Sequence, residues 1–162
     1  SFQYSSTTPE VMQAAGELLA AGVDVGDINR RIYQEIPLST LMVNREVLNH
    51  MVVECRGQLS HYTMPAGRKA ELGISLEDTK DLVDIIRTVQ GVRVSIIFED
   101  LEDGRIRMSL RSKDPQINVS DIAARFGGGG HAMAAGIRMQ GEMEDVRTRV
   151  LAAIREQLNK AE

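Results

Sequence analysis

Residues 92–111 read VRVSIIFEDLEDGRIRMSLR and predict two strands joined by a tight turn. Val92–Phe98 is a nearly continuous apolar run, which is typical of a strand covered on both faces. Asp103-Gly104 is a strong hairpin-turn signal. Arg105–Arg111 then alternates polar and apolar residues, so we expect one set of side chains to face a core, namely Ile106, Met108 and Leu110.

Strand signals also lie on both sides of this segment. Val52–Cys55 and Leu59–Met64 flank Gly57 and predict a second hairpin, and Ile137–Met139 predicts a further strand. Pro65–Gly73 is expected to be a loop.

Helices are predicted between these strands. Ser75 and Asp78 form a capping pair before an apolar stripe at helical spacing, made of Leu82, Ile85, Ile86 and Val89. Asn118 caps a short helix with Val119, Ile122 and Phe126 inward and Gly127 at its end, and a terminal helix follows over Glu142–Leu158. The pattern indicates an α/β (α+β) fold, a mixed β-sheet of about five strands flanked by helices.

The first 50 residues are helical in this interpretation and form an N-terminal extension. Thr8-Pro9-Glu10 begins one helix, Asp24 caps a second, and a third runs from about Ser39 to Met51. The apolar stripes of the first two helices need a partner surface, and they consist of Val11, Ala15, Leu18, Leu19, Ile28, Ile32 and Ile36. One alternative is that these helices form a homodimer.

Composition limits the classes of function. The 162 residues carry a net charge of −4, which argues against holding nucleic acid by bulk electrostatics, so any anion site must be local. The longest apolar runs are too short to span a bilayer, and we expect no membrane partner. The single cysteine, Cys55, fits a reducing cytoplasm. Because the chain begins at Ser1 without Met or a signal-peptide pattern, we interpret it as a fragment.

The most unusual segment is Gly127-Gly128-Gly129-Gly130-His131, followed by Ala132-Met133-Ala134-Ala135-Gly136. Four glycines in a row allow backbone N–H groups to approach a ligand and form an anion-binding nest. His131 would donate to a phosphate oxygen or pass a proton, and the alanine-rich residues would begin a helix. A flexible linker with a structural His131 is the alternative.

Arg111-Ser112-Lys113 ends the alternating strand, so two cations and a hydroxyl are expected to converge on one edge of the sheet. Arg105, Arg107 and Ser109 share the face of Arg111 and form a basic stripe, for which a solvated outer face is the alternative. Catalytic metal chemistry has little support, because His50, His61 and His131 are far apart in the sequence. The acidic pairs, Asp81 with Asp84 and Asp100 with Asp103, are expected to lie on the solvated surface.

Residues 117–131, INVSDIAARFGGGGH, resemble the GGGH motif of the C-terminal domain that accompanies DHH-family phosphoesterases. Ser109–Lys113 before this segment and Ala134-Ala135-Gly136 after it are similar to the family in order and spacing. Asp78-Thr79 and Leu82-Val83 resemble the branch of nanoRNases and 3',5'-bisphosphonucleotide phosphatases. The resemblance covers roughly residues 50–160.

The resemblance implies a domain organisation. Residues 1–8, SFQYSSTT, resemble the segment that follows the last acidic motif of the DHH catalytic domain, although Gln3 stands where Arg is expected. Residues 1–36 would be the tail of that domain, 37–50 a linker helix, and 51–162 the substrate-binding domain. No DHH triplet is present, so this fragment is expected to bind no cofactor, to contain no catalytic residue and to be inactive alone.

The resemblance also implies a function. The whole protein would be a Mn²⁺-dependent phosphoesterase acting on short oligoribonucleotides or adenosine 3',5'-bisphosphate, with short RNA or a nucleotide phosphate as its ligand. Substrate phosphate would contact a set of residues that includes Arg111, Ser112, Lys113, Gly127, Gly128, Gly129, Gly130 and His131. A single-strand exonuclease, a cyclic dinucleotide phosphodiesterase and a stand-alone nucleic-acid binding module remain as alternatives.

Overall fold

The computed structural model describes residues 7–75, 79 and 81–161. It divides the chain into two compact units, residues 1–37 and residues 38–162. Among the helices of the described residues, none is long and apolar enough to cross a membrane.

The first unit is helical over its described length. It contains α1 (Pro9–Ala20), α2 (Val25–Asn29) and the π-helical turn η1 (Arg30–Gln34). The two predicted caps are confirmed: Thr8 Oγ1 accepts from the Val11 N–H at 3.4 Å, and Asp24 Oδ1 accepts from the Asp27 N–H at 3.0 Å. No described residue of these helices is buried, and large apolar side chains such as Leu18 and Ile32 are exposed.

A six-stranded sheet organises the described part of the second unit, in the order β1-β2-β3-β4-β6-β5. Its strands are β1 (Val52–Glu54), β2 (Leu59–Met64), β3 (Val94–Asp100), β4 (Arg105–Ser112), β5 (Gly129–His131) and β6 (Ala134–Gln140). Strands β2 and β3 are parallel and the other neighbours are antiparallel, so the predicted mixed sheet is confirmed. The strand beyond the expected five is β5, within the glycine run.

Both predicted hairpins are present. β1 and β2 pair around Gly57, whose φ is +88°. β3 and β4 pair across a turn in which Gly104 has a φ of +77°. This is the left-handed conformation that glycine adopts without steric cost.

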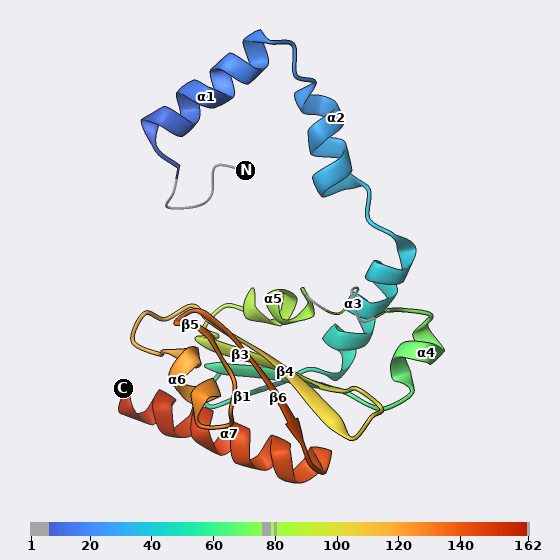
Figure 1. Ribbon diagram of the computed structural model, residues 1–162, viewed down its shortest axis with the longest axis vertical. Coiled ribbons are helices and arrows are strands. Elements are labelled where there is room, and N and C mark those ends of the chain that lie inside the picture. The colour runs from blue at the N-terminus through green and yellow to red at the C-terminus, as the bar shows by residue number, and fades with distance from the viewer. Residues whose placement is uncertain (1–6, 76–78, 80, 162) are drawn as a thin grey trace. The chain divides into compact units, whose positions relative to one another are not determined.

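Helices cover both faces of the sheet, as Figure 1 shows, with α3 and α5 on one side and α6 and α7 on the other. The helices of this unit are α3 (Leu38–His50), α4 (Arg68–Leu72), α5 (Leu82–Arg87), α6 (Val119–Ala124) and α7 (Met143–Lys160). The α6–α7 side holds the larger core, which includes Phe98, Ile106, Met108, Leu110, Ile122 and Ile154. The α3–α5 side holds a smaller one, which includes Val43, Val47, Met64, Leu82 and Ile86.

Three sequence-based expectations need correction. Pro65–Gly73 is not all loop, because it contains the five-residue helix α4 between Gly67 and Gly73, two glycines with left-handed backbones. The alanine-rich residues after His131 form strand β6 instead of a helix, because they pair with β4 and β5. The described part of the central helix begins at Leu82 and ends before Val89. Asp78 of the predicted capping pair lies outside the described residues.

Candidate functional site

The glycine run forms the edge strand of the sheet and the connection into it. After α6, Gly127 has a φ of +74°, and its N–H donates to the Ala124 carbonyl at 3.2 Å. The Gly128 N–H donates to the Ala123 carbonyl at 2.9 Å. These two N–H groups therefore close the end of the helix and do not belong to the anion nest that we predicted. Residues 129–131 form β5 and return through the turn at Ala132-Met133 into β6.

Two of the glycines are required by close contact between β5 and β6. A Cβ on Gly130 would lie 2.5 Å from the Ala134 carbonyl oxygen, and one on Gly128 would also collide with β6. A Cβ on Gly129 would meet nothing within 4 Å. Only Gly129 of these three leaves an open space above the sheet, and this is where a ligand can approach the backbone.

Strand register brings several predicted residues onto one face of the sheet. Arg111 lies opposite Ala134, which lies opposite His131. In the next row, Ser109 lies opposite Gly136, and Gly136 opposite Gly129. Residues directly opposite on neighbouring strands point to the same side of the sheet. Arg111, His131 and Gly129 therefore share a surface although they are separated in sequence.

The third row of this face consists of Arg107 and Arg138, which also lie opposite each other. The rows of Ser109 and Arg107 line an open depression of about 440 Å³. Its walls are Arg107, Ser109, Gly129, Gly136 and Arg138 together with adjoining backbone. The depression exists because Gly129 and Gly136 place no side chain on the sheet.

Ser112 and Lys113 are not brought together with Arg111. Ser112 is fully buried on the opposite face of β4, and its Oγ donates to the Asp114 carbonyl at 2.9 Å. The Lys113 ammonium donates to the Val89 carbonyl at 3.0 Å. The alternation of β4 separates Ser112 from Arg111, since neighbouring residues in a strand point to opposite faces. The expected convergence of all three residues is therefore wrong.

Arg111 itself is partly covered. Its side chain is 23% exposed, and Nε lies 3.5 Å from Asp84 Oδ1 of helix α5. This long ion pair orients the guanidinium while leaving donors for a ligand. His131, in the same row, is exposed at the edge of the sheet.

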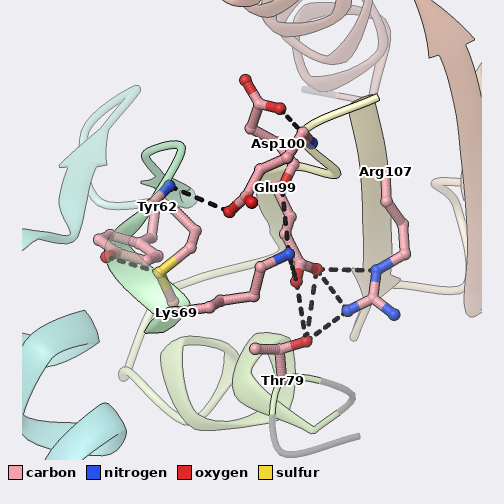
Figure 2. A network of polar contacts seen from close by, with 9 residues as sticks. Tyr62, Lys69, Thr79, Glu99, Asp100 and Arg107 are labelled. Carbon is pink, nitrogen blue, oxygen red and sulfur yellow. Dashed lines mark hydrogen bonds and ion pairs between the residues drawn. The ribbon is translucent and has the colours of Figure 1, made fainter. Parts of the chain in front are cut away.

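A buried network of charged side chains holds Arg107 in place (Figure 2). The Glu99 carboxylate, 2% exposed, accepts from Arg107 Nε at 2.8 Å and from Lys69 Nζ at 3.1 Å. The Thr79 hydroxyl donates to the same carboxylate at 3.1 Å. A solvated outer face is therefore wrong for Arg107, whose side chain is only 12% exposed. Arg105 is exposed and forms an ion pair with Asp103.

Sequence reasoning missed Arg138 as a member of this face. The signal was available, because Arg138 lies between Ile137 and Met139 in a predicted strand, and alternation places it away from the core. Which residues would lie opposite it depends on strand pairing, which periodicity does not reveal.

The described residues offer no site for the Mn²⁺ expected of the whole protein. Within residues 7–75, 79 and 81–161, no group of three or more His, Cys, Asp or Glu side chains could hold a metal ion. No step of chemistry is therefore assigned to a metal held by these residues.

A family model described as DHHA1 domain matches residues 61–160, the stretch that runs from within β2 to the end of α7. The chain belongs to the DHHA1 domain family. This DHHA1 chain is 35% identical over 161 residues to the bifunctional oligoribonuclease and PAP phosphatase NrnA of Thermus thermophilus, covering 99% of the chain and 47% of the relative. The NrnA of Bacillus subtilis is 27% identical over 135 residues, 83% of the chain and 42% of the relative.

A solved structure shares the fold of this DHHA1 chain. An exopolyphosphatase-related protein from Bacteroides fragilis matches with a TM-score of 0.82 and 28% identity, over 98% of the chain and 45% of that protein. The DHHA1 chain thus spans less than half the length of each of these three proteins.

Proposed function

We propose that this chain is the substrate-binding part of a metal-dependent phosphoesterase that hydrolyses short oligoribonucleotides, adenosine 3',5'-bisphosphate or both. The row formed by Arg111, Ala134 and His131 carries the proposal, because it joins a planar cation and an imidazole on the open face of the sheet. The names of the NrnA relatives support the substrate class.

In this proposal the chain binds and orients phosphate. The Arg111 guanidinium donates to phosphate oxygens in the forked geometry that suits them, while Asp84 limits its motion. His131 contacts the scissile phosphate or its neighbour from the edge strand, and the backbone at Gly129 allows close approach. Donors already in place as negative charge develops lower the barrier of the chemical step.

The remaining parts follow the same proposal. Residues 1–36 are the tail of a DHH catalytic domain, 37–50 a linker helix and 51–162 the substrate-binding domain. The large apolar side chains of α1, α2 and η1 are exposed, which supports a partner surface that covers these helices. The DHH catalytic domain supplies the Mn²⁺ site and the attacking water, so the 162-residue chain alone is inactive. The whole protein works in the cytoplasm.

Calorimetric titration of the chain with adenosine 3',5'-bisphosphate tests the binding role. Arg111→Gln should weaken binding about tenfold, the loss expected for a charged hydrogen bond. Arg125→Gln is the matched control, since Arg125 on the opposite side of the sheet is exposed and paired with Glu156. Equal affinities for the Arg111→Gln variant and the unmodified chain contradict the proposal, as does phosphate release by the chain alone in the presence of Mn²⁺.

A further inference from the structure

Two arginines face each other across neighbouring strands without a carboxylate between them. Arg107 of β4 and Arg138 of β6 are direct partners in the antiparallel register. Like charges directly opposite each other destabilise a strand pair. Glu99 compensates Arg107 from the other side, but the Arg138 side chain has no hydrogen bond or ion pair with any residue that the structure describes. The pair therefore leaves positive charge on the surface.

The surplus charge lies at the depression. Among the residues that the structure describes, Glu99 carries one negative charge and contacts two cations, Lys69 and Arg107, so this part of the network retains one positive charge. Arg138 adds a second positive charge at the rim. In a chain of net charge −4 this is a local concentration of positive charge. It can attract an anion where the molecule as a whole does not.

The depression separates two cationic rows. Arg107 and Arg111 are four residues apart on β4, or about 13 Å at the rise of a strand. Between them lies the row of Ser109, Gly136 and Gly129, which leaves the sheet uncovered. A nucleoside carrying a 3' and a 5' phosphate is shorter than this spacing, so it fits when its body lies over the glycines and the arginine side chains reach inward to its phosphates.

We infer that Arg107 and Arg138 form a second anion subsite for the second phosphate of a ligand whose first phosphate binds at Arg111 and His131. The inference rests on the proposed function and adds the residues that hold the second phosphate of its ligand. Glu99, which Lys69 also binds, holds the Arg107 guanidinium in place before the ligand arrives, and this reduces the ordering cost of binding.

The test compares three ligands with the 162-residue chain in buffer of physiological salt concentration. Adenosine 5'-monophosphate carries one phosphate, whereas adenosine 3',5'-bisphosphate and 5'-phosphorylated diadenylate each carry two. Arg138→Gln removes the exposed charge, and Arg105→Gln is the matched control on the same face, one row beyond the depression. Arg111→Gln reports on the first subsite.

Arg138→Gln should weaken the two-phosphate ligands about tenfold and change the monophosphate less than about twofold. A loss for both two-phosphate ligands supports the general subsite, and a loss for one of them identifies the source of the second phosphate. Equal affinity of the Arg138→Gln variant and the unmodified chain for both two-phosphate ligands, or an equal loss with Arg105→Gln, overturns the second subsite. In that case monophosphate binding that still depends on Arg111 leaves the proposed function standing. Failure of the unmodified chain to bind any of the three overturns both.

Discussion

A Cβ built on Gly128 would lie 2.2 Å from the carbonyl oxygen of Gly136 on the neighbouring strand β6. It would also lie 2.8 Å from Cγ1 of Ile137, a core side chain. Real Cβ atoms do not approach backbone this closely, so any side chain at position 128 must push β6 away from the glycine run. The glycine therefore has a packing role that is independent of ligand binding.

Gly128→Ala should lower the free energy of unfolding by about 1–3 kcal/mol, the range of overpacked cores. Gly129→Ala is the matched control and should leave it nearly unchanged, because the added methyl meets open space. Urea unfolding followed by circular dichroism measures both. Equal stabilities of the two variants would show that β6 moves away at little cost.

Replacing Glu99 should leave two cations, Lys69 and Arg107, without their shared carboxylate. Glu99→Gln is expected to cost about 3–5 kcal/mol, as for other buried pairs that lose one partner. Glu102→Gln is the control at an exposed carboxylate. If the Glu99 variant unfolds at the same urea concentration as the control, the network contributes nothing to stability.

Stability should depend on pH through His61, whose side chain is 8% exposed between β1 and α7. Burial is the main cause that lowers its pKa, Arg147 and Arg155 lower it further, and Glu54 opposes them. The unfolded chain therefore takes up this proton near pH 6.5, before the folded chain does. The contribution is present above that pH and is lost as pH falls through the folded pKa.

The measurement compares the free energy of unfolding at pH 7.5 and 5.5 for the unmodified chain and for His61→Gln. The difference between the two pH values should shrink in the variant. His131→Gln, at an exposed histidine of the edge strand β5, is the control. A pH dependence identical in all three proteins would exclude His61 as its source.

Asn118 should stabilise α6, the helix that leads into the glycine run. Its Oδ1 accepts from the Ser120 N–H at 2.9 Å and from the Asp121 N–H at 3.4 Å. Asn118→Ala is expected to cost about 1 kcal/mol, whereas Asn118→Asp retains the acceptor and should cost little. Thermal unfolding compares the two, and an equal loss in both would mean that the amide has another role.

Local pattern was sufficient for most of the secondary structure. The alternation of Arg105–Arg111 predicted which side chains of β4 enter the core, and Ile106, Met108 and Leu110 are buried. Helix α4 escaped prediction because five residues between two glycines are too few to show a period. The alanines after His131 were misassigned because their helix propensity is outweighed by pairing with β4 and β5.

The sequence by itself determined which residues of β4 lie on the side away from the larger core, because side-chain direction alternates with every residue. It also indicated that the backbone of the glycine run, residues 127–130, closely approaches another group. Only the tertiary structure decided that the neighbour is β6, and which residues share a row. Register is a relation between segments distant along the chain, and it joins Arg111 with His131 and Arg107 with Arg138. The ion pair of Arg107 likewise depends on register, because the pairing of β3 with β4 places Glu99 opposite Arg107.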